Sequence, residues 1–332
     1  MLTKGYGKLK SSFLPFFFVS LFVSLNAYAD DTKALSLKAQ AQDQAIEAAQ
    51  EEFDPSADDY RQRLRRTVSM PEEYFPNEID YYMRYVPSRG ASSQSGSVAI
   101  TDSGAEYSYE LKAFGKLPVQ FGVSTEYIGV KNSTAVQLPA YLTSTSFGVE
   151  TTLPFFGVDK TYFTLALAPT ISTDNWNFRS SAFSLLQRYF LIHQPNEKWT
   201  FICGAAVWPG YEDEVLPIVG FIYKPNDKWT FNIIPKGPEI SYAMTEKLTV
   251  FGEGDMSGYE FVVTQDDHKN VRLEYNEIHA GGGLRYKPNK NVNASVSIGG
   301  MFNRSLKYRP DSLGKVVIKD GLYSAFRLEL YF

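Results

Sequence analysis

The chain has 332 residues, 15% of them aromatic, and a formal net charge of −4. Its mean hydropathy is only −0.25 although it contains 22 Tyr and 24 Phe. This combination favours strands that face lipid on one side and water on the other over a soluble core. The acidic balance argues against a nucleic-acid partner. The single cysteine, Cys203, excludes an internal disulfide.

Residues 1–29 have the pattern of a secretory signal peptide. Lysines precede an apolar run over 13–25, and Ala27-Tyr28-Ala29 supplies the small residues of a cleavage site. The apolar run is too short to span a bilayer, which needs roughly 20 residues. No later stretch of the sequence is long and apolar enough for a transmembrane helix. We therefore expect an exported chain whose mature part begins at Asp30.

The segment 30–75 is predicted to be a helical or partly disordered periplasmic extension. It is rich in Ala, Gln, Glu and Lys up to Glu52, and Phe53-Asp54-Pro55 interrupts the helix-compatible pattern. An arginine cluster follows between 61 and 66. A solvated charged face is the simpler interpretation of this cluster, and contact with lipid phosphates is the alternative.

From 76 to 332 the sequence has the two-residue period of β-strands. In segment 322–332, Leu328 and Leu330 share one face with Phe332, whereas Arg327 and Glu329 share the other. Comparable alternation recurs over 105–113, 119–127, 278–286 and 292–303. These runs approach the roughly 9–11 residues that a tilted membrane strand needs. Segments 183–192 and 215–223 are apolar on both faces.

Pro-Asn turns recur between the predicted strands, at 194–198, 224–228 and 287–291. Trp199 and Trp229 each begin the strand after such a turn, where an indole would lie at the bilayer interface. We predict that these two residues and Phe332 mark the membrane interface. Longer polar connections are predicted at the other end, at Ser88–Ser103, Asp174–Ser180, Gln265–Asn270 and Arg304–Asp320.

The fold predicted from these patterns is all-β: a transmembrane antiparallel up-and-down β-barrel of about 14 strands, with 12 as the alternative. Ile79–Val86 supplies the strand that makes the number even. In hydrocarbon every backbone N–H and C=O must be paired, and a chain without membrane helices achieves this only as a closed barrel. The expected location is the outer membrane of a Gram-negative cell, in contact with outer-membrane lipid.

Three motifs resemble an outer-membrane β-barrel family that is filed as a domain of unknown function. They are Lys224–Phe231, Ile233–Pro238 and the terminal Tyr331-Phe332, and the resemblance covers most of 79–332. A last strand that ends in Phe also resembles the signal read by the barrel assembly machinery. The resemblance implies a barrel and this assembly partner, and brings no activity, cofactor or catalytic residue.

The polar faces of the strands would converge on the barrel interior. The residues predicted to line it are Glu106, Glu110, Lys112, Glu126, Glu150, Glu253, Asp255, Glu277, His279, Arg285, Arg327 and Glu329. Their excess of acids predicts a narrow, cation-leaning pore or small-solute transporter. The same residues would also suit a filled, non-conducting structural barrel that presents surface loops. A transporter of hydrophobic substrates is a third hypothesis, which needs a lateral opening or an apolar internal groove.

An enzyme is the least favoured class. Barrel phospholipases and lipid A deacylases resemble one another in a His-x-Ser pair, and none of the three histidines here has a Ser at that spacing. Asp266 and His268 have the spacing of the Asp-x-His pair of omptin-type proteases, yet no second acidic pair is identifiable. His279 is expected to belong to a lumenal charge network. We expect no catalysis, no cofactor and no metal, and the sequence leaves the oligomeric state open.

Overall fold

The computed structural model describes residues 77–92, 94–113, 117–174, 179–209, 214–235, 237–265, 268–309 and 311–332. The predicted signal peptide and the predicted helical extension lie outside these residues. No helix among the described residues is long and apolar enough to cross a membrane. The helical structure that is described consists of two short 3-10 turns, η1 (Ser180–Ala182) and η2 (Asp311–Leu313).

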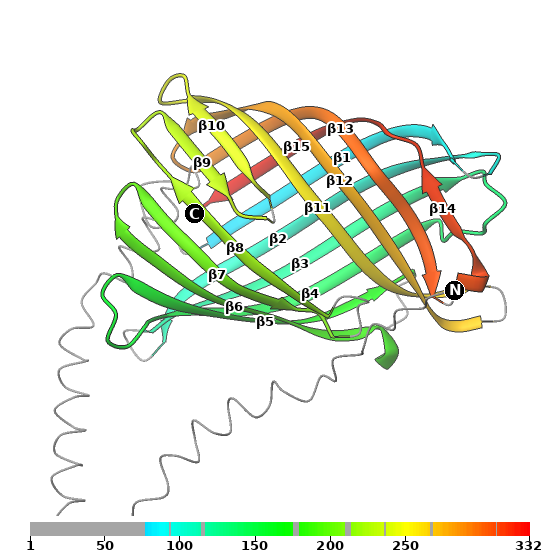
Figure 1. The fold of residues 1–332 in the computed structure, drawn as a ribbon, viewed down its shortest axis with the longest axis horizontal. Helices are drawn as coiled ribbons and strands as arrows, with labels where there is room; N and C mark the ends of the chain where they lie inside the picture. The colour runs from blue at the N-terminus through cyan, green and yellow to red at the C-terminus, as the bar shows by residue number, and fades with distance from the viewer. Residues whose placement is uncertain are drawn as a thin grey trace, which may run out of the picture. The chain divides into compact units, whose positions relative to one another are not determined.

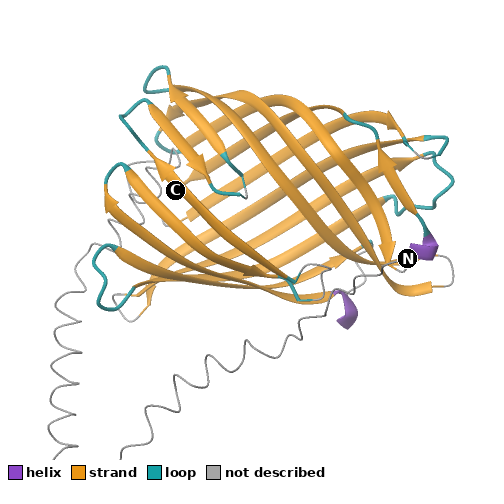
Figure 2. Ribbon diagram, in the orientation of Figure 1, coloured by secondary structure: helices purple, strands orange, loops and turns teal. Residues whose placement is uncertain are grey.

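The described chain forms a closed antiparallel barrel in which strands adjacent in sequence are paired (Figure 1). The strands are β1 (Asn77–Gly90), β2 (Ser97–Ala113), β3 (Leu117–Asn132), β4 (Tyr141–Pro154), β5 (Thr161–Thr173), β6 (Phe183–Asn196), β7 (Trp199–Val207), β8 (Val215–Tyr223), β9 (Trp229–Ile233), β10 (Glu239–Ala243), β11 (Leu248–Gln265), β12 (His268–Asn289), β13 (Val292–Arg309), β14 (Lys315–Ile318) and β15 (Gly321–Tyr331). Strand β1 pairs with β15 and closes the barrel. Figure 2 shows that strands make up almost the whole wall.

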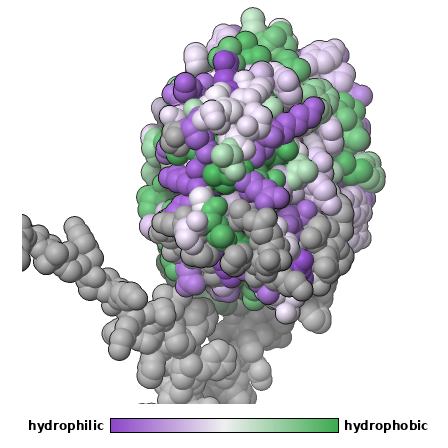
Figure 3. All heavy atoms as spheres, turned by 90° about the vertical axis from the view of Figure 1, so that its right-hand side faces the viewer, coloured by the Kyte–Doolittle hydropathy of each residue, from purple (hydrophilic) through white to green (hydrophobic). Residues whose placement is uncertain are grey.

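Strand β14 is an addition to the loop between β13 and β15, so the wall itself has 14 strands. The predicted count of about 14 is therefore confirmed. The two ends of the described chain meet at one end of the barrel, where the Asn77 N–H donates to the Phe332 carbonyl at 3.1 Å. We call this the short-turn end, because 197–198 and 290–291 form two of its turns. The opposite end is the long-loop end, where hydrophilic and hydrophobic side chains are mixed on the surface (Figure 3).

The half of the barrel nearer the short-turn end has apolar side chains on its outside. Large exposed residues on this face include Tyr107, Val123, Phe147, Val219, Leu284, Val296, Ile298, Leu322 and Phe326. Polar residues alternate with them and point inward, as expected for a wall between lipid and water. We call this half the belt zone. Its close strand packing requires small residues at several points; a Cβ on Gly283 or Gly299, for example, would lie 2.2 Å from a carbonyl oxygen of the neighbouring strand.

The half nearer the long-loop end has the opposite pattern. Its inward-facing side chains form one apolar cluster that includes Val86, Val98, Ile100, Ile128, Leu142, Phe261, Val263, Leu273, Met301, Leu306, Tyr308 and Ile318. Every one of these side chains is at least nine-tenths buried. Charged residues of the same strands, such as Glu260 and Arg272, alternate with the cluster and face outward. We call this half the cap zone, because its interior is packed as in a soluble protein.

The cap zone corrects two predictions about loops. Strands β1 and β2 extend to Gly90 and from Ser97, and β13 extends to Arg309, so much of Ser88–Ser103 and Arg304–Asp320 is strand. These segments lack an outward apolar face because they rise above the apolar belt, and the sequence pattern therefore suggested loops. The lengths of β11 and β12, 18 and 22 residues, also exceed the roughly 9–11 residues that span a bilayer.

The wall of the cap zone closes with fewer strands than the wall of the belt zone. Strands β9 and β10 have five residues each, and β7 and β8 have nine. Above them β11 approaches β5 directly, in a parallel pairing of Val262 with Thr173. The Thr264 N–H also donates to the Asp174 carboxylate at 2.8 Å. The barrel is thus wide at the short-turn end and narrow at the long-loop end, as the converging strands in Figure 1 show.

Candidate functional site

The boundary between the two zones is a buried ionic layer centred on Arg84 of β1. The Arg84 guanidinium lies 2.6 Å from the Asp102 carboxylate and 2.5 Å from that of Glu277. All three side chains are at least nine-tenths buried. The Tyr275 hydroxyl donates to Glu277, so the second carboxylate is held by two donors. Two buried acids thus share the guanidinium of Arg84.

His279 completes the ionic layer. The Arg84 guanidinium contacts the Nδ1 atom of His279 at 3.1 Å. Because a guanidinium can only donate, Nδ1 accepts this bond and carries no proton. The imidazole also meets the ring of Tyr323 edge-on at 5.3 Å between centroids. The contacts with Arg84 and Tyr323 thus fix the orientation of the His279 ring, and its Nδ1 lone pair accepts the bond from Arg84.

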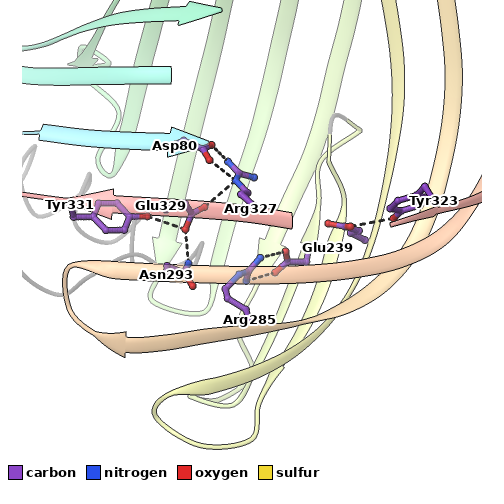
Figure 4. Close-up of polar contacts among 9 residues, drawn as sticks. Asp80, Glu239, Arg285, Asn293, Tyr323, Arg327, Glu329 and Tyr331 are labelled. Carbon is purple, nitrogen blue, oxygen red and sulfur yellow. Dashed lines mark hydrogen bonds and ion pairs between the residues drawn. The ribbon is translucent and has the colours of Figure 1, made fainter. Parts of the chain in front are cut away.

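A second set of polar contacts lines the interior closer to the short-turn end (Figure 4). Arg327 bridges the carboxylates of Asp80 and Glu329, with 3.3 Å to the latter. Glu329 also accepts from Asn293 at 2.5 Å and from Tyr331 at 3.2 Å. Most carboxylates in this region therefore have a donor from a neighbouring strand.

Two further contacts in Figure 4 link strands across the interior. Arg285 of β12 binds Glu239 of β10 with both guanidinium nitrogens, at 3.0 and 2.6 Å. The Tyr323 hydroxyl donates to Glu253 at 3.3 Å. The bidentate geometry fixes the orientation of Arg285, which also lies 4.8 Å from the centroid of the Phe251 ring.

A cavity of about 270 Å³ lies inside the barrel, beside the ionic layer. Its lining comes from β1 to β6, from β11, and from the residue that follows β7: Asp80, Tyr82, Ala105, Glu106, Ser124, Thr125, Glu126, Ser144, Ser146, Thr170, Leu186, Trp208, Gly258 and Tyr259. The Tyr82 hydroxyl contacts Glu126 at 3.0 Å and Asp102 at 3.2 Å, and so joins the cavity to the ionic layer. Most of the wall can accept hydrogen bonds.

The structure places the predicted lining residues in different surroundings. Glu106 and Glu126 line the cavity, and Glu277 and His279 belong to the ionic layer. Four others make the contacts near the short-turn end described above: Glu253, Arg285, Arg327 and Glu329. Glu150 lies 3.5 Å from Arg188, and Asp255 accepts a hydrogen bond from Ser257 at 2.7 Å. Glu110 is buried, and Lys112 is exposed. Most of these acids thus have a hydrogen-bond or ion-pair donor beside them.

The residues at the centre of the ionic layer were not predicted from the sequence. Arg84 and Asp102 were not among the predicted lining residues, although alternation over 79–86 places Asp80, Tyr82 and Arg84 on one face. Asp102 was assigned to a loop. Arg304, fully buried under the cap, was also assigned to a loop, and a positive φ of 49° at Asn303 shifts the alternation of β13 just before it.

The outer face near the short-turn end carries stacked aromatic side chains. The ring of Trp199 lies 4.1 Å from that of Tyr223, and the ring of Trp229 lies 4.8 Å from that of Tyr242, measured between centroids. Trp229 and Phe332 are 39% and 53% exposed. These positions suit an aromatic belt at a membrane interface.

The family described as Domain of unknown function (DUF6268) matches residues 116–332. The chain belongs to this family. The match covers β3 to β15 and leaves out β1 and β2, which carry Arg84 and Asp102. No curated protein matches the chain.

Several solved barrels are similar to this DUF6268 chain at low identity. The KdgM porin is 12% identical over 77% of this chain and 99% of the porin, with a TM-score of 0.33. An outer membrane channel from Pseudomonas putida F1 is 9% identical over 78% of this chain and 96% of the channel, with a TM-score of 0.43. The P. putida toluene transporter TodX is 8% identical over 80% and 93%, with a TM-score of 0.37. These likenesses are too distant to carry a substrate or an activity to this chain.

One side of the interior of this DUF6268 barrel is apolar. Phe190 and Ile192 of β6, Ile202 of β7 and Ile222 of β8 alternate with the outward residues of their strands and pack together. Phe190, Ile192 and Ile222 come from the segments that the sequence shows to be apolar on both faces. We call these four residues the apolar wall. The opposite side, formed by β1 to β4, carries the serines and carboxylates of the cavity.

No group of three His, Cys, Asp or Glu side chains in the described part of the chain could hold a metal ion. The Nδ1 atom of His193 lies 2.9 Å from the Thr161 hydroxyl on the wall of the barrel. Asp266 and the side chain of His268, the possible protease pair, lie outside what the structure describes.

Proposed function

We propose that this protein is a transport barrel of the outer membrane that moves small solutes and is closed at rest. The observation that carries the proposal is the cavity of about 270 Å³, which lies in the interior of a 14-strand wall and directly beneath the packed cap zone. A barrel of this size falls between small barrels filled with side chains and porins with an aqueous channel. The apolar outer belt supports insertion in the membrane, and β15 would present the final Phe332 to the assembly machinery.

The closed cap argues against a permanently open porin. Apolar residues from eight strands of the wall and from β14 meet in the cap zone, and apolar constrictions block ions by excluding water. Passage along the axis therefore needs a rearrangement of the cap or the loops. We expect rare, small openings of the wild-type protein in planar bilayers.

We further propose that the open state prefers cations. Glu106 is exposed to the interior and Glu126 lies beside it in the cavity wall, so permeating ions meet carboxylates below the cap. Substituting both residues, as Glu106→Gln with Glu126→Gln, should lower the cation-to-anion permeability ratio about two- to threefold. The reversal potential in a KCl gradient measures this ratio.

The matched control for the selectivity measurement is Glu260→Gln, because Glu260 is an acid on the outside of the cap zone. It should leave the reversal potential unchanged, although its ion pairs with Arg272 and Arg309 are lost. A wild-type preference for anions would contradict the assignment of the interior charges.

A filled, non-conducting structural barrel is the second candidate, and the pairing of most interior charges favours it. Solute permeation into proteoliposomes that contain the purified protein distinguishes the two functions. Permeation of any small solute above the level of empty liposomes supports transport. Impermeability of the wild type and of variants with a weakened cap would favour the structural role. We also propose that the barrel is not an enzyme, since the Nδ1 atom of His279 already accepts a bond from Arg84.

A further inference from the structure

The hydrogen-bonded wall of the barrel is interrupted on one side. Strand β11 pairs with β10 up to Glu253 and touches β5 at Val262. Between these points β12 is its neighbour on one side, and no described strand pairs with residues 254–261 on the other. Strand β6 faces this interruption, since its pairing with β7 ends at Gln187 and leaves 183–186 beyond it. The interruption lies between β8 and β11 in Figure 1.

The interruption lies at the level of the apolar belt. Met256 of β11 is 63% exposed, and its neighbours across β12 and β13, Ile278 and Phe302, are 36% and 43% exposed. Unpaired backbone groups are not tolerated against hydrocarbon, and they occur at membrane depth only where they line protein or water. On this edge the Gly254 N–H donates to the Pro238 carbonyl at 2.9 Å and the Met256 N–H donates to the Asp255 side chain at 2.8 Å. The rest of the edge needs polar partners at a place where the outside of the barrel is apolar.

The cavity lies directly behind this edge. Leu186 of β6 and Gly258 and Tyr259 of β11, which belong to the two sides of the interruption, line the cavity together with Trp208. The far side of the same cavity is the polar wall with Ser124 and Ser146. The cavity thus extends from the interruption in the wall to the hydrogen-bonding groups of the interior.

Apolar side chains form a path from the cavity toward the short-turn end, and one charged residue interrupts it. Leu186 is followed along the inner face of β6 by Arg188, which lies 3.5 Å from Glu150, and then by Phe190 and Ile192. Ile192 is paired with Ile202 of β7. Leu216, at the start of β8, is 38% exposed and shares the inner face with Ile218 and Ile222. An apolar body could follow this path, while the polar wall across the interior offers acceptors to a head group.

We propose that the interruption is a lateral opening through which small amphipathic molecules pass from the outer leaflet into the barrel. The expected substrate has an apolar body and a head group that donates hydrogen bonds, such as a hydroxyl. Its size is small, because the cavity of about 270 Å³ lies just below the roughly 300–1,000 Å³ of pockets that hold drug-sized ligands. This inference rests on the proposed transport function and names its route and its substrate class.

The test is photolabelling of the purified full-length protein in lipid nanodiscs by a short-chain alkyl alcohol that carries a diazirine. Mapping by mass spectrometry should find labelled interior residues, among them Leu186, Trp208 and Tyr259. The variant Leu186→Trp narrows the opening and should reduce this interior labelling about tenfold. The matched control is Leu191→Trp on the outer face of the same strand, which should leave interior labelling unchanged.

The outcomes separate this inference from the proposed function. Labels confined to outward residues such as Val219 and Ile298, or interior labels that Leu186→Trp does not reduce, would overturn the lateral opening. Interior labelling with no permeation of any solute in proteoliposomes would instead contradict transport and leave the opening in place. A hydrocarbon diazirine without the hydroxyl should label the interior less than the alcohol does. Equal interior labelling by the two probes would overturn the proposed head group.

Discussion

Replacing Arg84 with Met should lower the free energy of unfolding by about 3–5 kcal/mol, because it leaves two buried carboxylates without their cation. Arg84 lies within 2.6 Å of both Asp102 and Glu277, and the three side chains are almost fully buried. A buried ion pair adds little compared with a well-packed apolar pair, but removal of one partner is costly. The effect should be large because two acids depend on one arginine.

Equilibrium urea unfolding in lipid vesicles measures this loss. The control is Arg188→Met, since Arg188 and Glu150 are 3.5 Å apart with side chains 52% and 35% exposed, and such pairs contribute about 0–1 kcal/mol. Adding Asp102→Asn and Glu277→Gln to Arg84→Met should recover much of the stability. An Arg84→Met protein as stable as the Arg188→Met control would show that the ionic layer does not hold the two zones together.

Hydrating the cap should open the barrel along its axis. Phe261 and Leu273 are a cross-strand pair in the apolar cluster, and they are 1% and 0% exposed. Replacing both with Ser puts hydroxyl groups and free volume into a layer that now excludes water. Since apolar constrictions gate by dewetting, the conductance of single channels should rise on the order of tenfold.

Planar-bilayer recording on folded protein measures this change, and heat-modifiable migration on gels confirms that the barrels are folded. The matched control is Val250→Ser with Leu284→Ser, a cross-strand pair of the same two strands that faces outward in the belt zone. This control also loses apolar volume but does not touch the cap, so its conductance should equal that of the wild type. An unchanged conductance in the cap variant would mean that the cap zone is not the barrier.

The belt zone could be predicted from the sequence, because alternating apolar and polar residues in a membrane strand place the apolar side chains against lipid. Segment 322–332 alternates apolar and charged residues, and β15 places Leu322 and Phe326 outside and Arg327 and Glu329 inside. A period of two fixes which residues share a face, and the Pro-Asn turns fix where strands end. The closed architecture and the approximate strand count followed from these two signals.

The cap zone could not be predicted, because there the same period has the opposite polarity. Val98 and Ile100 face inward and are flanked by the polar residues Ser97 and Thr101, so a pattern that expects apolar residues on the outside predicts a loop here. The contact of β11 with β5 joins residues 89 positions apart (262 − 173), and no local pattern encodes such a pairing.

The cap zone and the apolar wall change the function that the sequence predicts. A polar interior along the whole barrel would have favoured an axial pore, whereas the packed cap makes the belt zone a chamber with one closed end. The excess of acids remains a feature of the chamber, and the apolar wall adds a second surface beside it. Both surfaces are needed for a solute that is partly apolar and partly hydrogen-bonding.

In the cap zone apolar residues face inward, whereas in the belt zone they face outward. The reactivity of two single-cysteine variants, made in a Cys203→Ser background, tests this difference most directly. Thr101→Cys places a thiol on the outside of the cap zone, and Ile100→Cys places one on its inside, where Ile100 is 1% exposed. A membrane-impermeant thiol reagent added to whole cells should modify Cys at 101 rapidly and leave Cys at 100 unmodified. Equal modification of both thiols, or protection of 101 with reaction at 100, would contradict a sealed cap above an apolar belt.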